Sequence, residues 1–133
     1  MTPIIVPTYA AILAFIYVFL SARVIRMRGA ARVAIGHGDN PRLERRMRVH
    51  ANFAEYVPLA LILLGFLEMQ AQSRYLIHGL ALLLIAGRTV HAFGVSQDKE
   101  NIRLRVTGMT LTFAVLLIAG LALLFNGLRA AFA

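Results

Sequence analysis

Long uncharged stretches are the feature that most limits how this chain can fold. Residues 1–22 contain no charged side chain, and the apolar segment from about residue 4 to residue 25 is long enough to cross a bilayer as a helix. Residues 106–128 form a second uncharged stretch of spanning length, which ends before Arg129. The sequence therefore predicts a membrane-spanning helix at each end of the chain.

Two more stretches of spanning length lie between these ends, and each contains one ionisable residue. Glu55 interrupts the first and Arg88 interrupts the second. The polar residues 70–73 between them make a short connection, so these two helices should form an antiparallel hairpin, the first of them kinked at Pro58. The prediction is an all-α membrane protein, a four-transmembrane-helix bundle in a single domain of residues 1–133, with helices at about 4–26, 48–69, 74–95 and 104–127.

The composition excludes several classes of protein. The chain is 59% hydrophobic and only 15% charged, whereas a soluble domain of this length needs more polar surface. The net charge of +8 could suggest nucleic-acid binding, but the basic residues flank the apolar stretches and no soluble domain carries them. The chain has no cysteine, and no two histidines have metal-ligand spacing on a helix face, so no metal is predicted.

The distribution of Lys and Arg predicts the orientation in the membrane. The two loops at about 26–48 and 96–105 are rich in basic residues, whereas the opposite side has only Arg74 and Arg129. Because basic loops are retained in the cytoplasm, both termini should lie outside it, in the inner membrane if the protein is bacterial. The basic residues of the two loops are Arg26, Arg28, Arg32, Arg42, Arg45, Arg46, Arg48, Lys99, Arg103 and Arg105.

Glu55 and Arg88 are expected at the same depth in the membrane. Each lies seven residues, about 10 Å of helix, from the cytoplasmic end of its helix, counted from Arg48 and from Val95. Charged groups within a bilayer are costly, so the two side chains should contact each other or share a ligand. The alternative to a ligand site is a structural ion pair that orients the hairpin.

Polar residues from all four helices point toward the cytoplasmic half. Helical spacing places Arg48, Asn52 and Glu55 on one face, and it places Arg88 and His91 on another. Together with Arg23 at the end of helix one and Arg105 at the start of helix four, they suit a small anionic ligand that also carries an ammonium group. Simpler explanations stay open: Arg23, Arg45 and Arg46 can snorkel at the interface, and His91 can be a core histidine bonded to a carbonyl.

The start of helix two resembles the signature of the MAPEG family, the membrane-associated proteins in eicosanoid and glutathione metabolism. The matching motif is Arg48-x-x-x-Asn52-x-x-Glu55-Tyr56-x-Pro58. Arg88-x-x-His91 on helix three, Ser21-Ala22-Arg23 on helix one and the pattern of four spans extend the resemblance over nearly the whole chain. Leukotriene-synthase-like members carry tyrosines at the positions of His91 and Val95, whereas the prostaglandin-synthase-like branch has a histidine at the first of them.

The resemblance implies a homotrimer that binds glutathione between adjacent subunits near the cytoplasmic face. The arginine at the base of helix four, Arg105 or alternatively Arg103, would stand near the glutathione sulfur, where a cation favours the thiolate. By the same resemblance, the residues that would hold the tripeptide are Arg23, Arg48, Asn52, Glu55 and Tyr56. Arg88 and His91, which share a face of helix three, are added to this predicted glutathione site.

Three classes of function follow from these observations. The leading hypothesis is a glutathione transferase or peroxidase that acts on lipophilic electrophiles dissolved in the membrane. The second is a non-catalytic lipid-binding or scaffold protein on the same fold. The third, a small multidrug exporter, needs a membrane-embedded carboxylate in helix one, and helix one is uncharged through Ala22.

Overall fold

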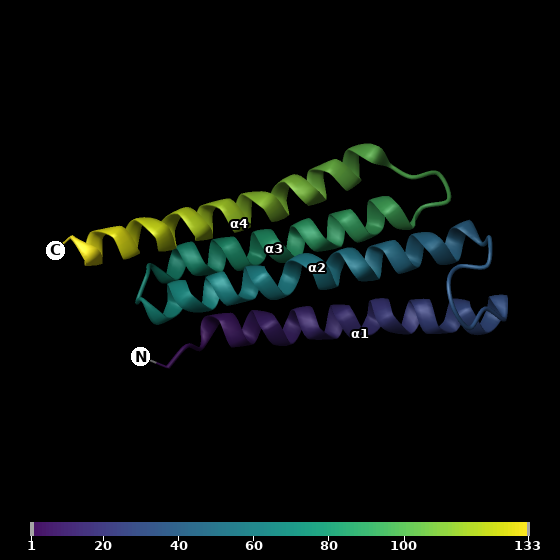
Figure 1. The fold of residues 1–133 in the computed structure, drawn as a ribbon, viewed down its shortest axis with the longest axis horizontal. Coiled ribbons are helices and arrows are strands. Elements are labelled where there is room, and N and C mark those ends of the chain that lie inside the picture. The colour runs from purple at the N-terminus through teal and green to yellow at the C-terminus, as the bar shows by residue number, and fades with distance from the viewer. Residues whose placement is uncertain (1, 133) are drawn as a thin grey trace.

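Four antiparallel helices make up the computed structural model, which describes residues 2–132. They are α1 (Ile5–Ala31), α2 (Pro41–Met69), α3 (Arg74–Ser96) and α4 (Ile102–Ala131) (Figure 1). Each is long and apolar enough to cross a membrane, so the predicted four-helix membrane bundle is confirmed. The start of α1 and the end of α4 lie at one end of the bundle, and the α1–α2 and α3–α4 connections lie at the other (Figure 1).

The helices extend further toward the basic end than the sequence analysis predicted. Helix α2 begins at Pro41 rather than at residue 48, and α1 continues to Ala31 rather than to residue 26. The predicted loop of residues 26–48 is therefore wrong, because most of it is helical. Only residues 32–40 connect the two helices.

Local signals explain where α2 begins. The side chain of Asn40 accepts hydrogen bonds from the backbone N–H groups of Arg42 and Leu43, both at 3.1 Å, and Pro41 occupies the first turn. An asparagine cap followed by proline is a strong start signal for a helix. The preceding turn contains Gly38 and Asp39, both with positive φ. The extra turns of α2 place more arginines on a rigid element.

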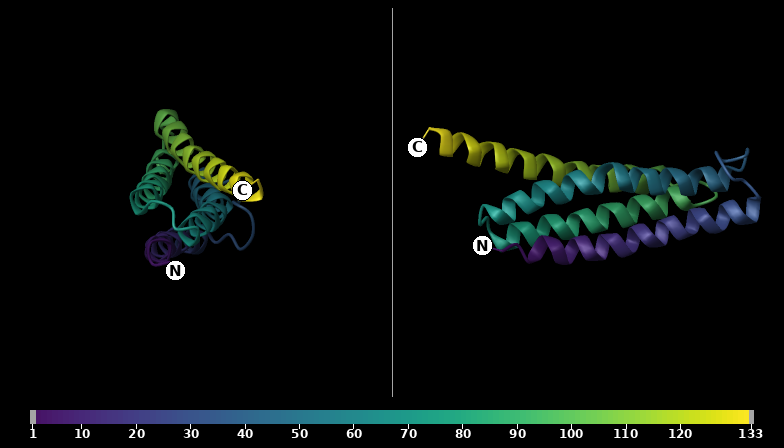
Figure 2. Two further views of the ribbon diagram at one scale, coloured as in Figure 1. Left: turned by 90° about the vertical axis from the view of Figure 1, so that its left-hand side faces the viewer. Right: turned by 60° about the horizontal axis from the view of Figure 1, so that its bottom comes forward.

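The buried core is narrow, and many large apolar side chains are exposed on the outer faces of the helices. This distribution would be unfavourable in water but suits lipid, where outward apolar surface costs nothing. Helix α3 packs against α2 and α4 and contributes most to the interior (Figure 2). The buried core residues of α2 follow one stripe: Val49, Phe53, Val57, Ala60, Leu64 and Leu67.

Glycine allows α3 and α4 to approach closely at the basic end. A Cβ atom added at Gly108 would lie 2.5 Å from the backbone nitrogen of His91 and 2.6 Å from the carbonyl oxygen of Gly87. Gly94 faces the first turn of α4 at a similar distance, with the backbone nitrogen of Arg105 2.9 Å from its added Cβ. The close contact of His91 with α4 therefore requires a glycine, which has no side chain, at position 108.

At the opposite end, Glu68 of α2 caps the first turn of α1. Its carboxylate accepts hydrogen bonds from the N–H groups of Ile4, Ile5 and Val6 at 2.7, 2.6 and 2.8 Å. These groups have no partner within their own helix, and α1 has no side-chain cap of its own. A carboxylate also suits the positive end of the helix dipole.

Glu68→Gln should loosen the start of α1 and cost about 1–2 kcal/mol of stability, because a neutral amide accepts fewer and weaker hydrogen bonds. Hydrogen exchange should accelerate at the amides of Ile5 and Val6, with a lower melting temperature in detergent. Glu55→Gln is the matched control, since Glu55 is an exposed carboxylate of the same helix. Equal protection of these amides in Glu68→Gln and in the wild type would contradict the capping role.

Reporter fusions should place the two ends of the bundle on opposite sides of the membrane. A reporter at the C-terminus should report a position outside the cytoplasm, and one inserted near Gly36 should report a position inside it. The reason is that the arginines gather at the end of the bundle that contains the α1–α2 and α3–α4 connections. A phosphatase and a fluorescent protein at each position provide reciprocal readouts. A cytoplasmic C-terminus would overturn this orientation.

Candidate functional site

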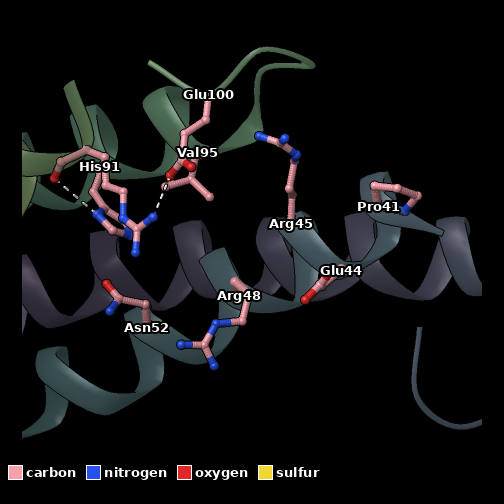
Figure 3. Close-up of a pocket in the computed structure, with 9 residues that line it drawn as sticks. Pro41, Glu44, Arg45, Arg48, Asn52, His91, Val95 and Glu100 are labelled. Carbon is pink, nitrogen blue, oxygen red and sulfur yellow. Dashed lines mark hydrogen bonds and ion pairs between the residues drawn. The ribbon is translucent and has the colours of Figure 1, made fainter. Parts of the chain in front are cut away.

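A polar cavity of about 260 Å³ opens at the basic end of the bundle (Figure 3). Three helices and the α3–α4 connection form its wall. Most of the lining side chains are polar or charged, in contrast to the apolar surface of the spans. The lining residues are Pro41, Glu44, Arg45, Arg48 and Asn52 of α2, His91 and Val95 of α3, Glu100 of the connection, and Arg105 of α4.

One face of α2 supplies the largest part of this wall. Glu44, Arg48 and Asn52 recur every four residues, so they lie one above another on the same side of the helix. The sequence pattern predicts Arg48 and Asn52 as site residues but not Glu44, because residue 44 precedes the predicted start of helix two at about residue 48. The same periodicity, continued back to the Asn40 cap, could have identified Glu44 and Arg45.

Arg105 enters the cavity from the first turn of α4. Its Nη1 atom lies 2.8 Å from Oε1 of Glu100, in the connection just before the helix. The side chain of Asn101 caps α4 by accepting a hydrogen bond from the N–H of Leu104 at 3.2 Å. Arg103 is exposed and does not line the cavity. Of the two arginines left open by the sequence, Arg105 is the one beside the site.

His91 lies on the inner wall, with 6% of its surface exposed. Its Nδ1 atom is 3.4 Å from the carbonyl oxygen of Arg105, a long hydrogen bond. A carbonyl only accepts, so Nδ1 must carry the hydrogen, and Nε2 of the neutral ring is left as an acceptor. The carbonyl contact expected for a core histidine is present, and the same ring also faces the cavity.

Arg88 lies behind the wall rather than in it. It is 1% exposed, and its Nη1 donates to Oδ1 of Asn52 at 2.6 Å while Nη2 contacts Sδ of Met109 at 3.4 Å. The predicted direct contact with Glu55 is wrong: within residues 2–132, the ion pairs join Arg42 to Asp98 and Arg105 to Glu100. Glu55 is exposed on α2. A ligand shared by the two side chains stays a prediction.

The other predicted site residues lie outside the cavity of a single chain. Arg23 is half-buried on α1, its guanidinium 5.9 Å from the Phe19 ring centroid. Tyr56 is half-buried between the guanidinium of Arg88, 5.7 Å from its ring centroid, and the ring of Phe113. The structure thus brings together Arg48, Asn52, His91 and Arg105, and it leaves Arg23, Glu55, Tyr56 and Arg88 outside the lining.

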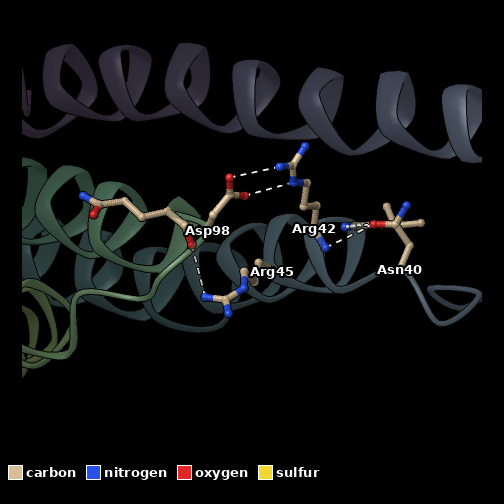
Figure 4. Close-up of polar contacts among 6 residues, drawn as sticks. Asn40, Arg42, Arg45 and Asp98 are labelled. Atoms are coloured by element: carbon tan, nitrogen blue, oxygen red, sulfur yellow. Dashed lines mark hydrogen bonds and ion pairs between the residues drawn. The ribbon is translucent and has the colours of Figure 1, made fainter.

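Two arginines of α2 contact the α3–α4 connection (Figure 4). Arg42 forms a bidentate ion pair with Asp98, with Nε 2.9 Å from Oδ1 and Nη2 3.0 Å from Oδ2. Arg45 donates a hydrogen bond to the carbonyl oxygen of Gln97 at 3.2 Å. The Arg42–Asp98 pair is largely exposed, so it adds little stability. Together with the Arg45 contact, it joins α2 to the connection that carries Glu100.

The charges of the cavity suit a ligand that carries both signs. Three arginines supply planar donor groups that bind carboxylates, and two glutamates can accept from an ammonium group. Within the described chain, no three His, Cys, Asp or Glu side chains gather in a way that could hold a metal ion. The arrangement therefore favours recognition of a small charged organic molecule at the membrane surface.

Four spanning helices with a polar cavity at one end define a small multi-pass integral membrane protein. The model of the MAPEG family matches residues 6–125. The chain is 35% identical over 114 residues to the inner membrane protein YecN of Escherichia coli strain K12, and the aligned residues cover 86% of each protein. The identity and the coverage are the same for YecN of E. coli O6:H1 strain CFT073. This chain belongs to the MAPEG family and is of the bacterial type.

Proposed function

We propose that this protein is a membrane-bound glutathione-dependent transferase or peroxidase that acts on lipophilic electrophiles. The observation that supports this most directly is the cavity in which Arg48, Asn52 and Arg105 meet. Glutathione has two carboxylates, one ammonium group and one thiol, which matches a wall of arginines and glutamates. Membership of a family associated with glutathione gives independent support.

Two arginines and one of the glutamates of the cavity have different roles in this proposal. Arg48 anchors a glutathione carboxylate through its planar donor group. Arg105 stands beside the sulfur, where its charge lowers the pKa of the thiol and raises the fraction of nucleophilic thiolate. The thiolate then forms a bond from sulfur to an electrophilic atom of a substrate that reaches the cavity from the bilayer, and a leaving group such as the halide of an aryl halide departs with the electron pair of the bond that breaks. Glu44 or Glu100 accepts from the ammonium group.

The complete site in this proposal lies between the subunits of a homotrimer. Arg23, Glu55 and Tyr56 belong to the family motifs, yet they lie outside the cavity of one chain, and Glu55 is exposed. A neighbouring subunit would bring such surface residues to a shared ligand. Native mass spectrometry from detergent tests the assembly, and a monomer at all concentrations would contradict it.

Arg48→Ala should weaken glutathione binding about tenfold, or about 1.4 kcal/mol, because one charge-assisted contact to a carboxylate is lost. Isothermal titration of the purified protein measures the affinity, and conjugation of glutathione to an aryl halide measures the activity. Arg32→Ala is the matched control, since Arg32 is exposed in the α1–α2 connection away from the cavity. A wild-type protein that binds no glutathione would overturn the proposal.

A second candidate function is non-catalytic lipid binding on the same fold. It is favoured by an apolar groove of about 310 Å³ between α1 and α2, lined by residues such as Leu13, Tyr17, Val57 and Leu61. A flexible acyl chain fits such a groove, and no chemistry is required there. Glutathione binding without conjugation, together with copurified lipid, would favour this alternative.

A further inference from the structure

The contact between Arg88 and Asn52 fixes the orientation of an amide group at the cavity. Nη1 of Arg88 lies 2.6 Å from the Asn52 side chain. A guanidinium only donates hydrogen bonds, so the atom of the Asn52 amide that faces it must be the oxygen Oδ1 and not the NH₂ group. The NH₂ group of Asn52 is therefore held on the side away from Arg88.

Asn52 lines the cavity, and Arg88 does not. We propose that Arg88 is a positioning residue, which acts through Asn52 and directs its NH₂ group toward an acceptor oxygen of the bound ligand. The proposal rests on the proposed function for the identity of that ligand, a peptide with carbonyl and carboxylate oxygens. In this proposal Arg88 does not make the ligand contact that the sequence suggested, but orients the side chain of Asn52 from a buried position.

The surroundings of Arg88 explain why it can hold this orientation. The side chain is almost fully buried, its second terminal nitrogen Nη2 contacts the sulfur of Met109, and its guanidinium lies over the ring of Tyr56. Its Nε atom is buried without a hydrogen-bond partner among residues 2–132. Because no carboxylate neutralises Arg88 in this part of the chain, the Asn52 oxygen is the strongest acceptor available to it.

A double-mutant cycle on glutathione affinity tests whether Arg88 acts through Asn52. Arg88→Lys keeps the charge but loses the planar fork, and it should weaken glutathione binding about tenfold, as should Asn52→Ala. In the double variant the loss should be no larger than in Asn52→Ala alone, because the amide that Arg88 orients is gone. The KM for glutathione should rise more than kcat falls. Losses that simply add would overturn the proposal.

A measurement on the ligand-free protein tests the geometry independently of glutathione. Asn52→Asp keeps an oxygen toward Arg88 and adds a negative charge, so it should form an ion pair and melt at or above the wild-type temperature. The same change removes the donor from the cavity, so glutathione affinity should fall at least about tenfold. A lower melting temperature for Asn52→Asp would overturn the contact, even if Arg88→Lys failed to fold.

The two measurements also separate this inference from the proposed function. A wild-type protein without glutathione affinity would contradict the proposed function, while the melting temperature of Asn52→Asp would still support or overturn the Arg88–Asn52 contact. If glutathione binds normally to Asn52→Asp, the assignment of the amide as a ligand donor is wrong.

Discussion

Replacing Arg105 with alanine should lower the rate of glutathione conjugation about 100-fold, while the affinity for glutathione falls less than about tenfold. The reason is that Arg105 supplies positive charge at the sulfur, which matters most when the thiolate forms and attacks. The pKa of the bound thiol should therefore rise in Arg105→Ala. Titration of thiolate absorbance measures this pKa, and steady-state kinetics measure the rate.

Arg103→Ala is the matched control for this experiment. Arg103 lies two residues away on the same helix, carries the same charge and is exposed outside the cavity. Its replacement should leave both the thiol pKa and the rate close to those of the wild type. If Arg103→Ala raises the thiol pKa and Arg105→Ala does not, the assignment to Arg105 is wrong.

Gly108→Ala should destabilise the bundle by about 3 kcal/mol and abolish ligand binding. The added methyl group would meet the backbone of His91 and of Gly87, at 2.5 and 2.6 Å. Neither contact is the flexible end of a side chain, so α3 and α4 must separate. This movement displaces His91 and Arg105 from each other. Thermal unfolding in detergent and glutathione titration measure the two effects.

Gly120→Ala in the same helix separates close packing from the general effect of removing glycine. A Cβ atom at Gly120 would have nothing within 4 Å. Because alanine favours helix over glycine, this variant should be as stable as the wild type or more stable by up to about 1 kcal/mol. Equal stability of Gly108→Ala and Gly120→Ala would show that α3 and α4 do not approach as closely as described.

The amino-acid sequence alone was sufficient to predict the four spans, because length and hydrophobicity decide whether a segment can cross a bilayer. It also predicted the family, through a motif whose spacing places Arg48 and Asn52 on one face of a helix. Helix α2 begins at Pro41 rather than at the predicted residue 48, and Asn40 and Pro41 carry this start signal in the sequence itself. Local rules therefore determine the elements and the face on which each polar residue lies.

Only the tertiary structure decided which polar residues meet. Equal depth suggested that Arg88 would contact Glu55, but the packing turns Arg88 toward Asn52 and leaves Glu55 exposed. The choice between Arg103 and Arg105 likewise depends on how α4 is rotated against α3. Helical periodicity fixes the angles between residues of one helix, but the rotation of each helix about its own axis is set by contacts with its neighbours, such as the close approach at Gly108.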